Sequence, residues 1–368
     1  MEFPRRSKKH NKLISGIVAS CLGCAVSAYA DEKVSIVPYI VNGSEAQISD
    51  YPYMGLLTLN FLDAQDPRIF TFCGGTLLNE RYVLTAAHCV FAESEGKKTE
   101  FQRLEVAFNI QTISTDASVA SNRHAAQAIY YPDNYNNTSF QNDIAIIKLE
   151  KPVPSSLVPA NSYVKLAGSE SYRDSSFPFT LIGYGNTAPD IAVAPGETNE
   201  SDTLNKVAMS YLETAQCENS FTDSNITDSQ FCATGKIMND LRSGGCQGDS
   251  GGPLLFDDAG QLYQAGIVSF GPEICGNPLI EVQSVYTEVA DYSDWIASVL
   301  NGSEAPKQEI SGISFDGPDS DGTLPPVDAG SGGDIEVDSG GGGGGSFGGL
   351  TLLVLGLLGW NRRRALNI

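Results

Sequence analysis

The sequence CQGDSGGP, at Cys246–Pro253, decides the fold and the function of this 368-residue chain. It places Ser250 among three glycines, which let the backbone turn tightly and let a second backbone approach closely. A serine in such a turn can act as a nucleophile when a neighbouring base removes its proton. The amides of Gly248 and Ser250 could then point into one small space and stabilise an oxyanion. A glycine-rich turn alone is common, so the base and a carboxylate have to be found elsewhere.

The choice of base is narrow because the chain has only three histidines. His10 lies in an amino-terminal segment that we expect to be removed, which leaves His88 and His124. His88 follows an apolar run, Tyr82–Leu84, that is typical of a strand. His124 lies among polar residues, which predicts an exposed side chain. His88 is therefore the expected base.

The carboxylate that would orient this base is expected at Asp143, in the segment NDIAIIKL at Asn142–Leu149. Asp143 begins a hydrophobic strand, where burying a carboxylate is costly unless it is hydrogen-bonded. Most aspartates at strand starts only cap a turn, so this signal is weak alone.

Together, the segments around His88, Asp143 and Ser250 resemble the chymotrypsin/trypsin family of serine endopeptidases in order and spacing. CGGTL at Cys73–Leu77 and TAAHC at Thr85–Cys89 extend the resemblance, which covers residues 40–300. It implies a catalytic triad of His88, Asp143 and Ser250 that hydrolyses protein or peptide substrates without a cofactor.

The resemblance also implies an all-β fold of two six-stranded antiparallel barrels with a carboxy-terminal helix over Ala290–Leu300. His88 and Asp143 would come from the first barrel and Ser250 from the second. Strand-like runs agree with this picture, at Arg81–Leu84, Asp143–Leu149 and Gln264–Ser269.

Further residue roles come from the same resemblance. Ser269 would support the buried Asp143, and Phe270 and Gly271 would pair with the substrate backbone as an added strand. The amides of Gly248 and Ser250 would form the oxyanion hole.

The cysteines suggest disulfides. Cys21 and Cys24 lie in the amino-terminal segment, and the remaining six allow 15 pairings. Their spacing gives no support for a zinc site, and no metal is expected. The resemblance selects the pairs Cys73–Cys89, Cys217–Cys232 and Cys246–Cys275.

An activation step is implied by IVNGSEA at Ile40–Ala46, which resembles the amino terminus that family zymogens expose when cut. The propeptide would be residues 31–39, and the freed amine of Ile40 would pair with Asp249. Tyr39 precedes the cut, not Lys or Arg, so a tryptic activator does not fit.

The expected specificity pocket also departs from the tryptic pattern, which agrees with the uncharged Tyr39 before the cut. Gly244 stands where tryptic members carry Asp, Gly271 leaves the mouth open, and Ser284 replaces a frequent Gly. An uncharged pocket predicts a preference for large apolar or aromatic residues. Such a pocket fits Tyr39, so the enzyme would activate itself. The competing hypothesis is that Glu273 or Glu281 enters the pocket and restores basic specificity.

The amino-terminal residues 1–30 are expected to be a signal peptide. Five basic residues precede the apolar run Leu13–Val26, and Ala28–Ala30 offers a cleavage site for a bacterial signal peptidase. The alternative is lipoprotein processing at Cys21.

The carboxy-terminal part is expected to be an acidic linker, residues 301–345, followed by a hydrophobic segment, residues 346–368. The glycines Gly340–Gly345, the apolar run Leu350–Trp360 and the basic Arg362–Arg364 resemble the bacterial GlyGly sorting signal, which a rhomboid-type sortase cuts. The resemblance predicts transient membrane association and a secreted or cell-surface enzyme. The alternative is a disordered, weakly adhesive tail.

The net charge of −21 disfavours nucleic acid as a partner, and the chain is expected to act as a monomer. Calcium binding in the acidic segment Glu93–Glu105 is disfavoured by its lysines. Two other functions stay open: a pseudo-protease that only binds, and a surface adhesin in which the acidic tail matters more than catalysis.

Overall fold

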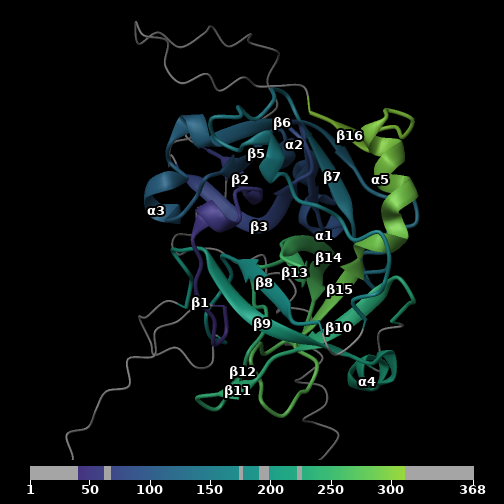
Figure 1. The fold of residues 1–368 in the computed structure, drawn as a ribbon. Coiled ribbons are helices and arrows are strands. Elements are labelled where there is room, and N and C mark those ends of the chain that lie inside the picture. The colour runs from purple at the N-terminus through teal and green to yellow at the C-terminus, as the bar shows by residue number, and fades with distance from the viewer. Residues whose placement is uncertain (1–39, 62–67, 174–176, 190–198, 222–225, 311–368) are drawn as a thin grey trace, which may run out of the picture. The chain divides into compact units, whose positions relative to one another are not determined.

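The computed structural model describes residues 40–61, 68–173, 177–189, 199–221 and 226–310. The expected signal peptide, the expected propeptide with Tyr39, and the tail beyond residue 310 lie outside the described residues. In the described part the chain forms two closed six-stranded antiparallel barrels, as expected, and both can be followed in Figure 1.

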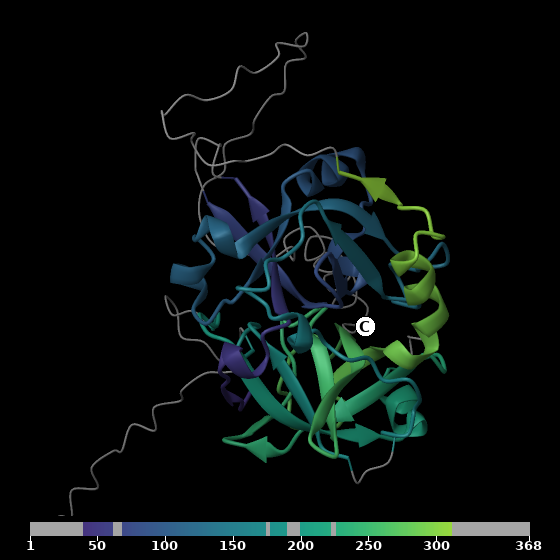
Figure 2. The same cartoon turned by 45° about the horizontal axis from the view of Figure 1, so that its top comes forward.

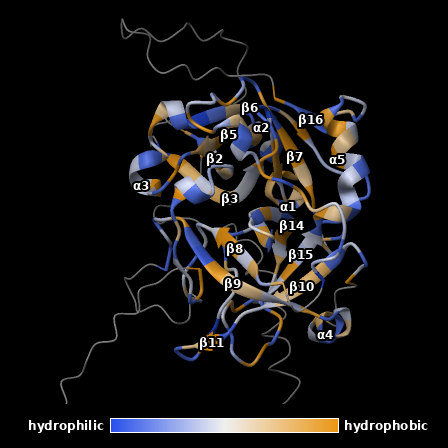
Figure 3. Cartoon of the chain, in the orientation of Figure 1, coloured by the Kyte–Doolittle hydropathy of each residue, from blue (hydrophilic) through white to orange (hydrophobic). Residues whose placement is uncertain are grey.

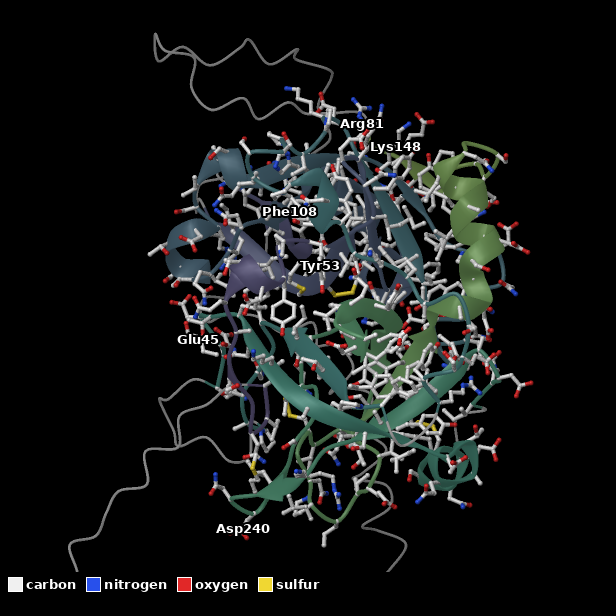
Figure 4. All side chains as sticks on the ribbon, in the orientation of Figure 1. Glu45, Tyr53, Arg81, Phe108, Lys148 and Asp240 are labelled. Atoms are coloured by element: carbon white, nitrogen blue, oxygen red, sulfur yellow. A yellow bond between two sulfur atoms is a disulfide. The ribbon has the colours of Figure 1, made fainter. Side chains whose placement is uncertain are left out.

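The first barrel closes through the strand order β6-β5-β2-β3-β4-β7-β6. Its strands are β2 (Met54–Asn60), β3 (Ile69–Leu77), β4 (Tyr82–Thr85), β5 (Leu104–Phe108), β6 (Arg123–Tyr130) and β7 (Ala145–Leu149). Every residue of β2 is buried, and Phe108 of β5 has no exposed surface in this barrel's core (Figure 4).

The second barrel closes through the order β8-β9-β10-β15-β14-β13-β8. Its strands are β8 (Phe179–Gly183), β9 (Asn205–Leu212), β10 (Gln230–Thr234), β13 (Pro253–Asp258), β14 (Gln261–Phe270) and β15 (Ser284–Glu288). The short strand β1 (Ser44–Glu45) pairs with β9, and β11 (Ile237–Met238) pairs with β12 (Leu241–Arg242).

The expected strands are present with slightly different ends. Arg81–Leu84 corresponds to β4, Gln264–Ser269 lies inside β14, and the strand expected from Asp143 begins at Ala145 as β7. Orange stretches in Figure 3 mark the hydrophobic residues of strands such as β2 and β7.

The helices are short and lie between strands or after the last strand. They are α1 (Ala87–Val90), α2 (Glu95–Phe101), α3 (Ile113–Asp116), α4 (Thr214–Ser220) and α5 (Ser293–Leu300). The expected terminal helix from Ala290 starts as a 3₁₀ turn, Val289–Tyr292, and continues as α5. Ile296 and Val299 of α5 are buried in the hydrophobic cluster of the first barrel, beside which α5 lies in Figures 1 and 2.

The fold continues past the boundary expected at residue 300. Strand β16 (Gln308–Glu309) pairs with β6, and Ile310 is buried against the first barrel. Lys307 forms an ion pair with Asp133. The linker expected from residue 301 therefore begins no earlier than residue 311.

The three disulfides join Cys73 to Cys89, Cys217 to Cys232 and Cys246 to Cys275, which confirms the expected pairing. Among the described residues, no helix is long and apolar enough to cross a membrane. The segment for which membrane association is expected, residues 346–368, is not among them.

Candidate active site

His88 is fixed by the short helix α1, which follows strand β4 of the first barrel. The neighbouring Cys89 is bonded to Cys73 in β3, and Ala86 and Ala87 are fully buried. These contacts hold the backbone on both sides of His88, while its side chain keeps 21% of its surface exposed. His88 is therefore anchored but accessible.

Asp143 holds His88 through both of its carboxylate oxygens. Oδ2 lies 2.7 Å from the ring atom Nδ1, and Oδ1 accepts a hydrogen bond of 2.8 Å from the His88 backbone amide. A carboxylate only accepts, so Nδ1 carries the proton and Nε2 is the nitrogen left to act as a base.

Asp143 is fully buried, and the second barrel supplies its remaining partners. Ser269 of β14 donates a hydrogen bond of 2.5 Å to Oδ2, and Thr287 of β15 donates one of 2.8 Å to the Asp143 carbonyl. The Tyr292 hydroxyl also donates a hydrogen bond to the side chain of Asn142, the residue before Asp143. The buried carboxylate of Asp143 is thus hydrogen-bonded, as the sequence analysis required of a buried charge.

The electrostatics of this pair favour a charged imidazole. Burial by itself would lower the pKa of His88, but the negative charge of Asp143 and the hydrogen bond to it act in the opposite direction. The net effect is a pKa raised above the ordinary value of 6.5.

The loop that carries Ser250 depends on glycine at two positions with positive φ angles, 97° at Gly248 and 75° at Gly251. A Cβ atom at Gly251 would lie 2.2 Å from Oγ1 of Thr85, which is three residues before His88. The Ser250 carbonyl accepts a hydrogen bond of 2.8 Å from the Gly74 amide of the first barrel. The loop is therefore packed directly against the strands that precede the base.

Two features of this loop bear on the chemistry. In the described part of the chain, neither the Gly248 amide nor the Ser250 amide donates a hydrogen bond to a protein acceptor. Both donors are thus available to a ligand. Among the same residues no hydrogen bond joins the Ser250 side chain to His88, and Nε2 of His88 instead lies 3.7 Å from Sγ of Cys89. Such contacts are often long in unliganded enzymes.

Asp249 is buried in a space that two glycines leave for it. A Cβ atom at Gly183 or Gly185 would lie 2.1 Å or 2.4 Å from its carboxyl group. Oδ1 accepts from the Gly185 amide and Oδ2 from the Cys246 amide. Burial raises the pKa of Asp249 to about 7, against the lowering effect of these two hydrogen bonds. Ile40, the residue expected to follow the activation cut, is also fully buried, in the core of the second barrel.

The expected pocket residues are brought together at one place. A Cβ atom at Gly244 would lie 2.6 Å from Cβ of Gln283, and one at Gly271 would lie 2.6 Å from the Gln283 carbonyl. Ser284 follows Gln283, is buried, and accepts from the Gly245 amide at 3.3 Å. The nearest carboxylate among these contacts is that of Asp249, whose Oδ2 would lie 3.8 Å from a Cβ atom at Gly245.

Neither Glu273 nor Glu281, the acidic residues that could restore a preference for Arg or Lys, is buried among these pocket residues. Glu273 is exposed, and Glu281 is exposed with its carboxylate 3.5 Å from the Gln216 side-chain amide in α4.

Phe140 is a site residue that the sequence analysis missed. Its ring lies edge-on to His88, with centroids 5.7 Å apart, and also contacts Phe270 at 5.4 Å. Its φ angle of 54° is unusual for a phenylalanine and marks a constrained backbone. An aromatic residue in a polar loop three positions before Asp143 was the available signal.

His124 differs from expectation. Its side chain is half-buried beside Phe108, and Nε2 is buried without a partner among the described residues. Burial lowers its pKa to about 4, so it stays neutral at pH 7. The apolar core around β5 outweighs the polar sequence neighbours that suggested exposure.

Two groups of side chains have the spacing of metal ligands, and both are otherwise engaged. Cys73 and Cys89, near His88, are bonded to each other. In the other group, Glu288 accepts hydrogen bonds from Arg173 and Tyr172.

Two barrels that join a histidine, a buried aspartate and a serine loop define the architecture of a serine protease, and the chain belongs to the Trypsin family, whose model matches residues 40–296. It is 31% identical over 271 residues to Trypsin-1 of Astacus astacus, which covers 70% of this chain and 98% of that protein. It is 33% identical over 265 residues to Trypsin-2 of Salmo salar, covering 71% and 95%.

A third relative is the CLIP domain-containing serine protease B4 of Anopheles gambiae, 30% identical over 271 residues, with 72% of this chain and 71% of that protein covered. The family domain and these relatives identify the chain as a serine endopeptidase that acts on protein or peptide substrates.

Proposed function

We propose that this endopeptidase cleaves peptide bonds through an acyl-enzyme on Ser250, with His88 as the base and Asp143 as the group that orients it. The observation that carries the proposal is the contact of Nδ1 of His88 with the fully buried Asp143, because it directs Nε2 of His88 outward as a proton acceptor.

In this mechanism Ser250 Oγ attacks the peptide carbonyl while His88 takes its proton. The carbonyl oxygen becomes an oxyanion, which the amides of Gly248 and Ser250 stabilise. His88 then returns the proton to the leaving amine, and water hydrolyses the ester by the same steps in reverse roles. Asp143 keeps its negative charge throughout and stabilises the imidazolium that forms.

The substrate backbone binds along Phe270 and Gly271, where strand β14 ends, as an added strand. The side chain before the cut enters the region of Gly244 and Ser284. The one carboxylate near this region is that of Asp249, which accepts from the Gly185 and Cys246 amides and would pair with Ile40, so no free carboxylate remains for Arg or Lys. Large apolar and aromatic side chains are therefore preferred.

The chain is made as a precursor and is activated by cleavage between Tyr39 and Ile40. The buried position of Ile40 and the buried, glycine-lined carboxyl group of Asp249 support a pairing of the new amine with that carboxylate. Tyr39 suits an aromatic preference, so the enzyme cuts its own precursor. A precursor carrying Ser250→Ala should then stay uncut in isolation, and maturation at the normal rate would contradict self-activation.

The enzyme is exported, and its disulfides form outside the reducing cytoplasm. A signal peptidase removes residues 1–30, and a sorting protease processes the tail near Gly340–Gly345. Mass spectrometry of both ends of the mature protein tests these cuts together. An amino terminus at Cys21 carrying lipid would support the lipoprotein alternative instead.

The central test is labelling by a fluorophosphonate that reacts with activated serines. We expect labelling of the mature enzyme and none of the Ser250→Ala variant, with Ser220→Ala, an exposed serine of α4, as the matched control. An unlabelled, correctly cut wild-type enzyme would favour a pseudo-protease. Loss of surface attachment without loss of peptidase activity after deletion of residues 311–368 would show that the tail serves attachment, as the adhesin alternative requires.

A further inference from the structure

The chain continues beyond helix α5 as a short segment that is built into the first barrel. Residues 303–310, the strap, follow a turn at Gly302, whose φ angle is 80°, and end in β16 beside β6 (Figure 1). The Lys307 amide donates to the Ile129 carbonyl, and the Ile310 amide donates to the Gln127 carbonyl, both at 2.8 Å. Ile310 is only 5% exposed. The strap is therefore held by its backbone and by one buried side chain.

Strand β6 has room for the strap because its neighbour β5 is short. In the described part of the chain, β5 pairs with residues 123–125 of β6, whereas β7 pairs with residues 126–130 along the other edge. Without the strap, the Gln127 and Ile129 carbonyls would lie on an open sheet edge. The strap thus completes β6 at the end from which residues 131–142 continue.

Residues 131–142, the loop between β6 and β7, contain the neighbours of both His88 and Asp143. The Phe140 ring lies edge-on to His88, with the centroids 5.7 Å apart. The Asn142 side-chain amide donates to the Asn134 carbonyl at 3.0 Å, which closes the loop immediately before Asp143. The position of this loop therefore bears on the contact between His88 and Asp143.

The first half of the loop packs against the end of helix α1. The rings of Tyr131 and Tyr135 lie 5.6 Å and 5.2 Å from the ring of Phe91, measured between centroids. Phe91 is the residue that caps α1, and its amide donates to the Ala87 carbonyl of that helix. Because α1 carries His88, the loop contacts His88 directly through Phe140 and indirectly through this aromatic cluster.

The strap contacts this loop and the helix that follows α1. Nζ of Lys307 lies 2.5 Å from Oδ1 of Asp133 in the loop, and the Gln308 side-chain amide donates to the Lys98 carbonyl of α2 at 3.0 Å. The Asp133 side chain is 91% exposed, so the ion pair alone is weak. The pairing of β16 and the burial of Ile310 therefore supply most of the hold on this region.

We infer that the strap positions residues 131–142 for catalysis, and that Ile310 and Lys307 are positioning residues that act on His88 through this loop. The inference rests on the proposed function and adds a segment that lies beyond residues 40–296, the part matched by the family model. Release of the strap leaves His88 in place but less firmly oriented. It should therefore lower kcat more than it changes KM.

The first test is Ile310→Asp in the full chain, which places a charge at a buried position and releases the strap. We expect kcat of the folded enzyme on a peptide to fall about 3- to 10-fold, with KM changed by less than about twofold. Ile310→Leu should retain the wild-type kcat. Val158→Ala, which truncates a buried residue of the same hydrophobic cluster, is the control: it should lose stability but keep kcat.

The second test does not depend on the proposed chemistry. Amide hydrogen exchange is compared in full chains that carry Ser250→Ala, with and without Ile310→Asp. We expect faster exchange in residues 131–142 when the strap is released, and unchanged exchange in β13 of the second barrel. Unchanged exchange in residues 131–142 would overturn the inference whether or not the chain is a protease.

The outcomes for kcat also separate the inference from the proposed function. Equal kcat in the wild type and in folded Ile310→Asp would overturn the inference and leave the protease intact. A wild type that cleaves no peptide and has an unlabelled Ser250 would overturn the proposed function.

If Ile310→Asp does not fold, Lys307→Glu tests the same link at an exposed ion pair. We expect kcat to fall by about half and to be restored by adding Asp133→Lys. An unchanged kcat in Lys307→Glu would then overturn the inference.

Discussion

Ser269 of the second barrel donates a hydrogen bond of 2.5 Å to Oδ2 of Asp143, the same oxygen that lies 2.7 Å from Nδ1 of His88 in the first barrel. The Asp143 carboxylate therefore joins His88 of the first barrel to strand β14 of the second. The orientation of His88 depends on residues that lie far apart in the sequence and meet only when both barrels have folded.

Replacing Ser269 with alanine removes a donor from a buried negative charge. We expect the free energy of unfolding to fall by about 1.5–3 kcal/mol, the value of a hydrogen bond to a charged group, and kcat/KM to fall with it. Urea unfolding followed by fluorescence measures the first quantity. Ser171→Ala, at an exposed serine, is the control. A change below about 0.5 kcal/mol, the ordinary surface range, would contradict the prediction.

We expect the raised pKa of His88 to set the acidic limit of activity. His88 must be neutral to accept a proton, so kcat/KM should rise with pH through a value above the ordinary 6.5. Asp143→Asn removes the charge that raises this pKa. The variant should lose about 10⁴-fold in kcat, and its remaining activity should have its acidic limb at lower pH. An acidic limb at the same pH in the variant and the wild type would mean that a group other than His88 controls the pH dependence.

The raised pKa of Asp249 makes the uncut precursor sensitive to pH. Its folded pKa of about 7 exceeds the ordinary value of 3.8, so the folded state binds the proton more tightly than the unfolded one. Stability should therefore decrease as pH rises from about 4 to about 7, by up to about 4 kcal/mol. Melting temperatures of the Ser250→Ala precursor measure this, and adding Asp249→Asn should flatten the curve.

Cleavage before Ile40 should change this dependence, because a free amine would stabilise the ionised form of Asp249. The mature enzyme should then lose little stability between about pH 4 and pH 7, the range over which its precursor loses it. Parallel curves for the two forms would argue against the pairing of Ile40 with Asp249.

We expect that one substitution is not enough to place a usable carboxylate in the proposed specificity pocket. Gly244→Asp alone should give a poorly active enzyme without Arg or Lys cleavage, because its Cβ atom would lie 2.6 Å from Cβ of Gln283. Gly244→Asp combined with Gln283→Gly removes that obstacle and should cleave after Arg or Lys measurably. Peptides that vary only at the cut position report the change. Cleavage after Arg by the single variant would contradict this prediction, because the Gln283 side chain would then have moved to make room for the new carboxylate.

The segment after α5 should contribute to stability. A chain that ends at Gly302 should be less stable than one that ends at Ile310 by about 1.5–3 kcal/mol, the value of burying one isoleucine side chain. Thermal unfolding of the two chains makes the comparison. Ile310→Ala should account for most of the loss. Lys307→Gln should account for little, because the side chain of its partner Asp133 is 91% exposed.

Much of the fold and the site could be predicted because the decisive residues lie within short motifs. Ser250, His88 and Asp143 each have neighbours whose chemistry is local: glycines that allow a turn, or an apolar strand beside a buried charge. The disulfide pairs followed from the family resemblance, since the sequence alone left 15 pairings.

The rest depends on contacts between residues that are distant in the sequence. Phe140 becomes part of the site only because its loop folds over His88. Ile310 is buried by a barrel that ends long before it in the sequence, and its polar neighbours gave no sign of this.

The disulfide between Cys73 and Cys89 makes the position of His88 depend on oxidation of these two cysteines. Helix α1 has only four residues, too few to be stable alone, and its third residue is the bridged cysteine beside His88. In a reducing cytoplasm this anchor is absent, so we expect newly made chains to hold His88 loosely against Asp143. The oxidation state of one sulfur pair would then protect the producing cell from its own protease until the chain has left it.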